Sequence, residues 1–520
     1  MYILKSVQYL MIICLDKPLG PQYGGGIVVN PELNHGLKGW RTFGEAKIEH
    51  QESKDGNKFI IASKRNEPYH TWLQVSHGNA DIAAVFKTQS SYETAGWVVA
   101  QKGCWSMLKG GLVVNVSGPA DLYFESNNTK VDVWADSVSL QPFTHEEWKS
   151  HQDESIEKFR KQRVKFQAVD QHNKPIANAT VTITQTNSRF PFGSAINANI
   201  LSNAAYQKWF TSRFKYATEI NRGVENYAVS DALVRFAKSH GMAIRGHNVF
   251  WDNPIDQPNW VGGLSPNDLR AAASKRIKSV MRRYKGQFFH WDVVNENLHF
   301  SFFESKLGGY ASTDFYKTAN YLDPRPTPFL NEYNTIEVPD GAASPYKYLE
   351  KISQLRAQGY KGPLGIGLQG HFGNVNLPFT RAALDTIASA RLPTWVTELD
   401  VHSGPNQIHS HAAVQGIILW TAWSPGGCYR MCLTDNNFRN LPTGNVVDTY
   451  IRTFTQGSDG ITDPNGFFQT SLYHGQYEAK ISHPNGRIIN KSFNFNNINN
   501  VNDHQEAEPE GSILNFKITV

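Results

Sequence analysis

Between residues 190 and 454, short apolar runs alternate with longer amphipathic stretches, and this alternation constrains the fold more than any other feature of the sequence. Apolar runs such as 288–294 and 414–419 have the length of buried strands, and the stretches between such runs are long enough to form helices. Strands that alternate with helices favour a parallel sheet, and for one domain of about 250 residues the leading arrangement is the (β/α)8 TIM barrel. We therefore predict a (β/α)8 barrel at residues 189–456.

The chain on either side of this region has the pattern of β structure. Residues 24–143 contain several short apolar runs separated by Gly, Asn and Ser, without a helical period, which is typical of a β-sandwich such as a jelly roll. Residues 144–188 begin with Thr144 and Glu147 in the spacing of a capping box, which predicts a linker helix, and a β-hairpin is expected to follow it. Residues 457–520 predict a small β appendage, so the chain is expected to be multidomain.

Length and charge exclude several classes of protein. The 520 residues suffice for about three domains, so a single small binding module is excluded. The formal charge of +5 arises from 51 basic and 46 acidic side chains without a dense basic face, so no nucleic acid partner is expected. No apolar run reaches the roughly 18 residues of a membrane-spanning helix, so no membrane partner is expected either. We expect the chain to be a monomer.

Three features of the sequence indicate where the protein is located. They are the N-terminus, the cysteines and the glycosylation motifs. Residues 1–23 contain a short apolar patch after Lys5 without a clear small-x-small cleavage site, which we interpret as a weak or truncated leader. Cys428 and Cys432 have a C-x3-C spacing that matches no convincing zinc pattern, and buried or singly paired cysteines are the simpler interpretation. Together with the leader, four Asn-x-Ser/Thr motifs favour a secreted glycoprotein, and they begin at Asn115, Asn127, Asn178 and Asn490.

Polar side chains directly follow the apolar runs of several predicted barrel strands. Glu296 comes two residues after Val294, and Glu398 comes two residues after Val396. Active sites of such barrels lie at the carboxyl ends of the strands, so these side chains are expected to meet. A single carboxylate at such a position is most often a helix cap or an ion-pair partner. Capping alone does not explain two carboxylates that follow separate strands and have amide and histidine side chains beside them. Other polar residues in equivalent positions are Arg245, His247, Asn248, Asn331, Glu332, Asn334, Gln369 and His371.

Two facing carboxyl groups are what glycoside hydrolysis requires. One carboxyl must stay protonated to give a proton to the departing oxygen, and the other must stay ionised to attack the anomeric carbon. The retaining route needs the two groups about 5–5.5 Å apart. Glu296 and Glu398 are the natural pair for these two roles.

Five short motifs follow one another along the predicted barrel. They are RGHNVFW at 245–251, WDVVNEN at 291–297, NEYNT at 331–335, GLQGHF at 367–372 and WVTELD at 395–400. Together they resemble the plant endo-1,4-β-xylanases of glycoside hydrolase family 10 that carry a carbohydrate-binding module of family 22 in front. The resemblance extends over nearly the whole chain, from Gly25 to the C-terminal β region.

The resemblance implies retaining hydrolysis of the xylan of plant cell walls, with Glu296 as general acid/base and Glu398 as nucleophile. It also implies that Asn295 bonds the 2-hydroxyl of the sugar at the cleaved bond and that His371 holds the ionised Glu398. Further substrate contacts, in the same subsite or by stacking on sugar faces, are implied for His247, Gln369, Trp420, Trp423 and Tyr429. No catalytic cofactor or metal is implied, and the expected location is the cell wall or the extracellular space.

In the front module, the resemblance points to Tyr123 and Glu125 as xylan contacts, with aromatic stacking contributing on the order of 1 kcal/mol. Asp136 resembles a structural calcium ligand of such sandwiches. A hydrophobic corner at Tyr123 and a turn aspartate at Asp136 are at least equally good interpretations.

The sequence departs from the family at two places in the predicted barrel. Most of the family segment at the second strand, which supplies Glu, Asn and Lys to the glycone subsites, is missing, and Lys215 would stand for its Lys. Only the twelve residues 402–413 separate Val401 from Val414, so the seventh helix would be largely deleted. The barrel is therefore expected to be incomplete at strand 2 and helix 7, and the front module is also shortened near residues 68–75.

Three hypotheses follow from these departures. The first is a working retaining endo-1,4-β-xylanase. The second is a catalytically weak or inactive xylan-binding protein, because each missing polar contact would remove about 1–3 kcal/mol of transition-state stabilisation. The third is a defective or mis-assembled coding sequence.

Overall fold

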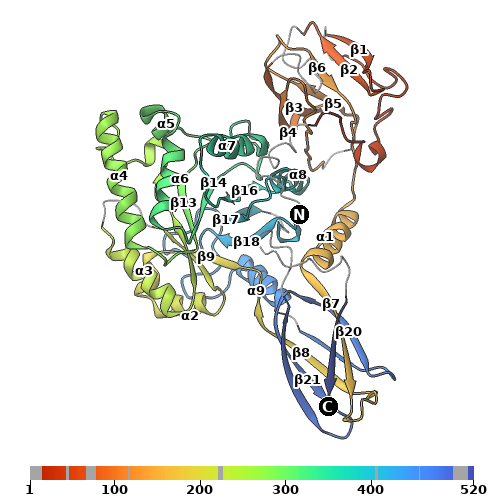
Figure 1. Cartoon of the computed structure of the whole chain (residues 1–520), viewed down its shortest axis with the longest axis vertical. Coiled ribbons are helices and arrows are strands. Elements are labelled where there is room, and N and C mark those ends of the chain that lie inside the picture. The colour runs from red at the N-terminus through yellow and green to blue at the C-terminus, as the bar shows by residue number, and fades with distance from the viewer. Residues whose placement is uncertain are drawn as a thin grey trace, which may run out of the picture.

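The computed structural model describes residues 15–42, 46–65, 78–114, 117–220, 226–403, 408–455, 457–495 and 513–520. It contains a front β module, a central barrel and a second β-sandwich, with helix α1 (His145–Phe159) lying between the front module and the second sandwich (Figure 1). None of the described helices combines the length and the apolar character that crossing a membrane requires. Most of the predicted leader, Asn115 and the shortened stretch near residues 68–75 lie outside the described residues.

The central domain is a closed barrel of parallel strands. Strand β18 pairs with β9, and β11 pairs with β13, so the ring of hydrogen-bonded neighbours closes. The predicted (β/α)8 barrel is therefore confirmed. The eight described barrel strands are β9 (Phe192–Ile196), β10 (Tyr216–Ile220), β11 (Ala243–His247), β13 (His290–Asn295), β14 (Thr327–Glu332), β15 (Gly365–Leu368), β17 (Thr394–Ser403) and β18 (Val414–Leu419), and the short strands β12 (Phe250–Trp251) and β16 (His371–Asn374) pair with β13 and β17.

The predicted incompleteness at strand 2 is wrong. Strand β10 occupies that place and pairs in parallel with both of its neighbours, so that Tyr216 lies opposite Gly193 and Ala243. The residues before it form helix α2 (Ala204–Thr211), which belongs to the preceding connection. The second strand is therefore present in the barrel.

Helices cover the outside of the barrel. Helix α4 (Pro266–Arg283) shows why they form, because the Ser265 hydroxyl accepts a hydrogen bond from Asp268 N and an apolar stripe at helical spacing faces the core. Their inner faces and the barrel strands build the main apolar core. The others are α2, α3 (Ala228–Ser239), α5 (Phe302–Leu307), α6 (Ala311–Leu322), α7 (Pro345–Ala357), α8 (Leu377–Ala388) and α9 (Pro442–Phe454), with the short 3-10 turns η3 (Ala198–Leu201) and η4 (Pro254–Asp256). A further 3-10 turn, η2 (Gln22–Gly25), lies in the front module.

The connection between β17 and β18 contains, in its described residues, only the 3-10 turn η5 (Ile408–Ser410), which confirms the predicted loss of helix 7. Helix α1 packs against this turn instead. Arg160, at the C-terminal end of α1, donates hydrogen bonds to the carbonyl oxygens of His409, His411 and Val414 at 2.8, 2.5 and 2.6 Å. The predicted linker helix therefore covers the barrel where an outer helix is missing.

Residues 161–188 and the C-terminal region together form one β-sandwich. The predicted hairpin is wrong, because β7 lies in one sheet and β8 in the other. Each strand turns an apolar face, represented by Phe166 on β7 and Val181 on β8, into the core between the sheets. The first sheet contains β20 (Phe467–Tyr473), β7 (Lys161–Val169) and β23 (Ile513–Thr519), and the second contains β19 (Ser458–Ile461), β8 (Thr180–Ser188), β21 (Gly475–Ser482) and β22 (Ile488–Phe495).

The described part of the front module is a sandwich of two sheets, as predicted. Ala62 from one sheet and Ile82 and Val98 from the other contribute to a shared core. The jelly-roll connectivity stays a prediction. The first sheet contains β1 (Lys47–Glu52), β2 (Lys58–Ser63) and β6 (Val133–Ala135), and the second contains β4 (Tyr92–Gln101), β3 (Asn79–Lys87) and β5 (Asp121–Glu125).

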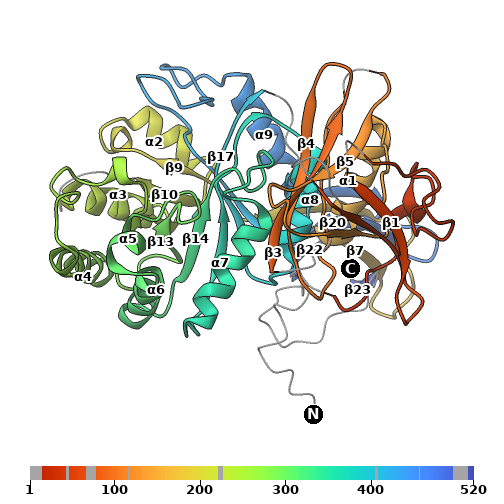
Figure 2. The same ribbon diagram turned by 90° about the horizontal axis from the view of Figure 1, so that it is seen from above.

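The front module contacts the barrel at helices α7 and α8 (Figure 2). Lys347 on α7 lies 3.3 Å from Asp81 on β3, and the Asn376 side chain, which caps α8, donates to the carbonyl oxygen of Gly111 at 3.1 Å. Tyr346 on α7 is buried within the apolar core of the front module. The two domains therefore meet through packed side chains as well as ion pairs.

Candidate active site

Polar side chains converge at the carboxyl ends of β11, β13, β14, β15, β17 and β18. Glu296 and Glu398, the two carboxyl groups predicted from the sequence, are both nearly buried there, with 7% and 3% of their surface exposed. Their environments differ in the charge of the surrounding donors.

Glu296 is held by neutral donors. It follows β13 in the left-handed region, with φ 59°, and its backbone N–H donates to Asn331 O at 2.9 Å. The Trp251 indole N–H donates to one carboxylate oxygen at 2.7 Å, and the Gln369 amide donates to the other at 3.1 Å. Burial, together with the negative charge of Glu398, raises the pKa of Glu296 in spite of these two hydrogen bonds. This carboxyl therefore keeps its proton to a higher pH than an ordinary glutamate.

Glu398 is held by donors that carry charge. The His371 Nε2 atom lies 3.3 Å from one of its oxygens, and His247 Nδ1 lies 3.6 Å from the other. The Asn331 amide donates to this carboxylate at 2.7 Å. Burial alone would raise the pKa of Glu398, but the charges of His247 and His371 outweigh it and lower the pKa to about 2. This carboxyl is therefore ionised at any ordinary pH.

His371 is an imidazolium in this arrangement, because both of its ring nitrogens face carboxylates. Nδ1 lies 2.8 Å from Asp400 and Nε2 faces Glu398. Burial lowers the pKa of His371, but the bonds to Asp400 and Glu398 raise it to about 10 overall. Asp292 holds His247 in a similar way, with 2.9 Å between Nδ1 and the carboxylate. The ionised Glu398 is thus matched by positive charge on two sides.

The Asn295 side chain has a hydrogen-bond donor in the site that has no acceptor among the described residues. Its side-chain oxygen accepts from the Asn331 amide at 2.9 Å, which fixes the direction of the side chain. Its amide nitrogen is buried and has no hydrogen-bond partner among the described residues. Such a donor is costly unless a ligand accepts from it.

Two of the three predicted sugar-stacking aromatics border the site. The Trp420 ring lies between His247 and His371, with its centroid 5.7 Å from each. Tyr429 is 68% exposed and its ring meets His371 edge-on at 5.5 Å. Trp423 is 6% exposed and is part of the core, so the prediction that it stacks on a sugar is wrong. Its ring packs between Tyr206 and Phe438, and its indole N–H donates to Asn436 at 3.0 Å.

Lys215 does not belong to the site. It lies just before β10, and its carbonyl oxygen accepts from Ala243 N at the amino-terminal end of that strand. The carboxyl groups lie at the opposite end of the barrel, so the predicted glycone-subsite role of Lys215 is wrong. Strand β10 begins only after Lys215.

Sequence reasoning missed several groups that complete the site. Trp251 and Asn331 stand within the motifs, yet only the structure shows that they bond Glu296 and Glu398. Arg430, with its Nε 3.4 Å from Asp400, lies in a loop that the Cys428–Cys432 disulfide closes, so these two cysteines are paired. The order of the motifs was the available signal, but motif spacing does not specify which side chains touch.

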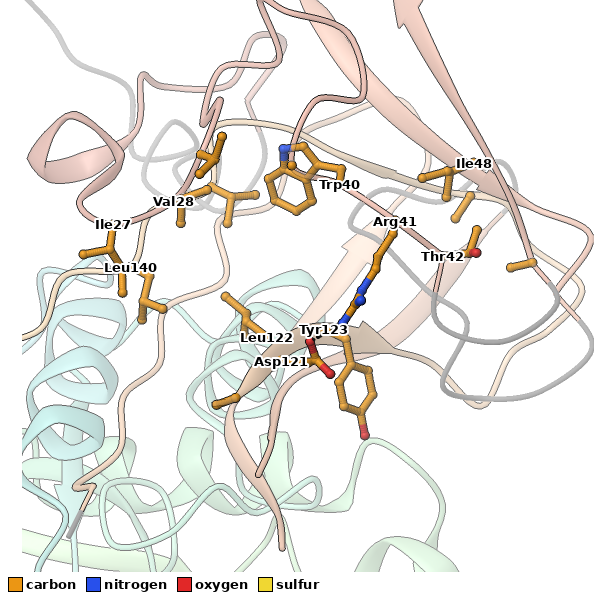
Figure 3. A pocket seen from close by; sticks show the side chains of 16 residues that line it. Ile27, Val28, Trp40, Arg41, Thr42, Ile48, Asp121, Leu122, Tyr123 and Leu140 are labelled. Atoms are coloured by element: carbon orange, nitrogen blue, oxygen red, sulfur yellow. Dashed lines mark hydrogen bonds and ion pairs between the residues drawn. The ribbon is translucent and has the colours of Figure 1, made fainter. Parts of the chain in front are cut away.

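The front module has a pocket of about 300 Å³ between its sheets, where Arg41 and Asp121 form an ion pair at 2.6 Å beside Tyr123 (Figure 3). The predicted xylan contacts Tyr123 and Glu125 are hydrogen-bonded to each other, and burial raises the pKa of both groups. Tyr123 is itself buried, which fits the hydrophobic-corner interpretation, whereas Tyr92 at its edge is exposed.

Asp136 accepts a hydrogen bond from Ser137 N at 2.5 Å, and burial raises the pKa of Asp136 to about 6. Among the described residues, no cluster of three or more His, Cys, Asp or Glu side chains is suited to a metal ion. Structural calcium at Asp136 stays a prediction.

Three comparisons place the chain among known proteins. The family model described as "Glycosyl hydrolase family 10" matches residues 182–418. "Endo-1,4-beta-xylanase 5-like" of Arabidopsis thaliana is 39% identical over 513 residues, which cover 90% of this chain and 90% of that protein. "Endo-1,4-beta-xylanase 5" of the same plant is 40% identical over 462 residues, with coverages of 82% and 81%. Xylanase 10B from Thermotoga petrophila RKU-1 in complex with xylobiose aligns at 23% identity with 52% of this chain and 95% of its own, with a TM-score of 0.45.

Proposed function

The chain belongs to glycosyl hydrolase family 10, and we propose that it is a retaining endo-1,4-β-xylanase with Glu296 as general acid/base and Glu398 as nucleophile. One observation carries the assignment of roles. Two buried carboxyl groups share one site, and their surroundings move their pKa values apart: the pKa of Glu296 rises, and the pKa of Glu398 falls to about 2. Such a pair supplies a proton donor and an ionised nucleophile at the same pH.

The chemistry then follows in two steps. In the first, Glu398 attacks the anomeric carbon and the glycosidic oxygen leaves with the proton of Glu296, which produces a covalent glycosyl-enzyme. In the second, ionised Glu296 takes a proton from water, which attacks the anomeric carbon and releases Glu398. The charge of Glu398 is one of the causes that raise the pKa of Glu296, and the ester removes that charge. The pKa of Glu296 is therefore lower in the glycosyl-enzyme, which keeps this group ionised and available to take the proton in the second step.

Other side chains support this chemistry from fixed positions. The free amide N–H of Asn295 suits the sugar 2-hydroxyl, a contact that strengthens as positive charge develops on the ring. The charge of His371 stabilises Glu398 as an anion and so favours its departure in the second step. Trp420 and the exposed Tyr429 offer apolar surfaces to sugar faces.

The alternative of an inactive xylan-binding protein is not favoured. The bond of Gln369 to Glu296, the contact of His371 with Glu398 and the presence of strand β10 support the working enzyme. The shortened connection after β17 is covered by α1, so it does not leave the strand of Glu398 without support.

Release of reducing ends from xylan by the purified protein tests this function. We expect activity in the wild type, its loss in Glu398→Gln, and little change in Glu304→Gln, a matched control that removes a carboxylate paired with Lys351 outside the barrel. Retention is read by proton NMR of the first sugar released from an aryl β-xylobioside, which should be the β-anomer. An α-anomer, or full activity in Glu398→Gln, would reject the assignment.

We further propose that the front module is a carbohydrate-binding module of family 22 that binds xylan near Tyr123 and Glu125, and that the protein is a secreted, monomeric glycoprotein of the cell wall. The disulfide at Cys428–Cys432 and the disulfide-bonded Cys104 fit an oxidising compartment. The motif asparagines at three positions are exposed, as glycosylation requires, namely Asn127, Asn178 and Asn490. Retardation by soluble xylan in a native gel tests the binding, and a mass shift on deglycosylation tests the glycans.

A further inference from the structure

A second buried carboxylate–histidine pair lies at the end of strand β14, against the turn that carries Glu296. Glu332, the last residue of β14, is 1% exposed, and one of its oxygens lies 2.7 Å from His299 Nδ1. The mechanism above gives neither residue a role. A buried ion pair contributes little to stability by itself, so its place beside the proton donor needs another explanation.

His299 is fixed as an imidazolium. Its Nδ1 faces Glu332, and its Nε2 lies 3.2 Å from Asp340, so both ring nitrogens must carry a proton to donate. The bonds to the two carboxylates outweigh burial and raise the pKa of His299 to about 9. Asp340 is in turn held by Asn334, whose amide donates to it at 3.0 Å. The ring therefore has one orientation and one charge through the neutral pH range.

This pair fastens the turn that carries Glu296. Phe300 N donates to Glu296 O at 3.1 Å, which closes the turn 296–300. Leu298 N, within the turn, donates to the second carboxylate oxygen of Glu332 at 2.8 Å. The His299 side chain leaves the same turn and bonds the first oxygen. Glu332 thus bonds the turn twice, from the end of the neighbouring strand.

Tyr333 is fastened by the same pair. Its ring stacks flat on the His299 imidazolium, with 3.8 Å between centroids and an interplanar angle of 7°. Its backbone N–H donates to Glu332 at 3.0 Å. Burial and then the charge of Glu296 raise the pKa of Tyr333 to about 12, which places the tyrosine in the field of the proton donor. One ion pair therefore sets both the turn of Glu296 and the ring beside it.

We propose that Glu332 and His299 are positioning residues for proton transfer by Glu296, because they clamp the turn 296–300 to β14 and so aim the Glu296 carboxyl at the departing oxygen. The proposal rests on the proposed role of Glu296 as general acid. The Glu296 residue sits in a left-handed conformation that a glutamate does not favour, so its turn needs such external fastening. Loss of the clamp leaves the nucleophile and its histidines untouched.

Two substrates with the same xylobiose part distinguish a specific loss of proton donation by Glu296 from general damage to the active site. Phenyl β-xylobioside has a poor leaving group that needs the proton, whereas 2,4-dinitrophenyl β-xylobioside has a leaving group that departs without it. For Glu332→Gln and for His299→Asn we expect kcat/KM on the phenyl substrate to fall about 10- to 100-fold, part of the gain that general acid catalysis supplies. On the dinitrophenyl substrate we expect less than about a threefold change, since proton donation is not needed there.

The matched control is Asp385→Asn. Asp385 on α8 also pairs with a histidine, His411, at 3.0 Å, but it lies away from the turn of Glu296. Its rates on the two substrates should change in parallel if they change at all, and thermal unfolding of each variant monitors folding. Parallel losses in the two positioning variants would overturn the inference while leaving the proposed function intact, and so would unchanged rates. A wild type that cleaves neither substrate would instead overturn the proposed function, and the inference with it.

Discussion

The active site has two halves, one at the end of β13 and one at β17, and each contains a buried glutamate. The pKa of Glu296 in the first half is raised, whereas the pKa of Glu398 in the second is lowered. On the β13 side, Glu296 is surrounded by neutral donors, an indole and an amide, and is held by a turn. On the β17 side, Glu398 is surrounded by His247 and His371 and is held by a strand. Both are buried to a similar degree, so burial does not decide their roles. The charge of the neighbours does, because a neutral donor leaves the burial penalty standing and a cation reverses it.

The halves also differ in their outer support. The β13 half is backed by α4, α5 and α6, and the clamp of Glu332 and His299 adds to them. The β17 half has, among the described residues of its connection, only one 3-10 turn, and it is backed by α1 through Arg160. The half that carries Glu398 therefore depends on a segment that precedes the barrel in the sequence.

The strongest test of the comparison removes the charge of the proposed nucleophile, Glu398. Glu398→Gln keeps the shape of the side chain but cannot form the glycosyl-enzyme, so kcat on xylan should fall on the order of 10⁴-fold or more. Reducing-end release measures it. Loss of the negative charge should also lower the pKa of His371, which a proton NMR titration of the imidazole would detect. Near wild-type turnover in this variant would show that Glu398 has no part in the reaction.

The next test removes the proposed proton donor, Glu296. Glu296→Ala should lower kcat/KM on xylan by about 10²- to 10⁴-fold, since the leaving oxygen is no longer protonated. Added azide should restore turnover of 2,4-dinitrophenyl β-xylobioside and yield a β-xylobiosyl azide, because an anionic nucleophile needs no base. Chromatography of the products checks this result. Rescue in Glu398→Gln but not in Glu296→Ala would reverse the assignment.

The acidic side of the pH profile tests the histidine support of Glu398. Activity requires ionised Glu398, so it is present above the pKa of that group, about 2, and is lost as the pH falls through it. His371→Asn removes a cation, so the pKa of Glu398 should rise and the acidic limb of kcat/KM should move up by about one to two pH units. Rates between pH 3 and 6 on an aryl xylobioside measure the limb. An unmoved limb would mean that His247 alone lowers the pKa.

A smaller effect is expected from the outer support of the β17 half. Arg160→Met leaves three backbone carbonyls without their donor, which should cost about 2 kcal/mol or more of folding free energy. Calorimetry should show the barrel transition lowered by roughly 5 °C. Arg163→Met, which changes an exposed arginine on β7, is the control and should leave the transition in place. Equal shifts in both variants would show that α1 does not support the barrel.

The smallest effect on catalysis is expected from the front module, which belongs to neither half. Glu125→Gln should weaken retention on insoluble xylan by roughly fivefold, a loss of about 1 kcal/mol typical of one polar contact. Hydrolysis of a soluble aryl xylobioside should be unchanged. Depletion from solution by increasing amounts of xylan measures the affinity. Unaltered retention would place the xylan surface elsewhere on the module.

The sequence predicted the barrel, and it predicted that Glu296 and Glu398 lie at one end of it, because both follow from order along the chain. An apolar run ends, a polar residue follows, and in a parallel barrel all such positions share one rim. It misassigned Lys215 and Trp423 for the same reason. Lys215 lies at the amino-terminal end of β10, and the sequence does not mark where that strand begins. Trp423 packs inward against Tyr206 and Phe438, although the sequence around it is equally compatible with an exposed ring.

Contacts between distant segments could not be predicted from local patterns. The apolar alternation of β7 and β8 fits a hairpin as well as two sheets, and only the partners from the C-terminal region decide between them. Arg160 has the pattern of a surface residue at the end of a charged helix, yet it bonds carbonyls some 250 residues away, at His409 and His411. The role of Arg160 depends on the short connection between β17 and β18. The length of that connection predicts that an outer helix is missing, but it does not predict which segment covers the barrel in its place.

The second sandwich makes the barrel an insertion within another domain. The chain leaves that sandwich after Ser188 and returns to it at Ser458, so β7 and β8 are synthesised long before the strands that cover them. During translation the apolar faces and the edges of β7 and β8 stay uncovered until β19 to β23 have been synthesised. Exposed strand edges of this kind favour aggregation. A chain that stops after the barrel would never cover them. We therefore expect the early part of the chain to need an intact C-terminal region to fold without aggregating, even though none of the described residues of that region lies in the active site.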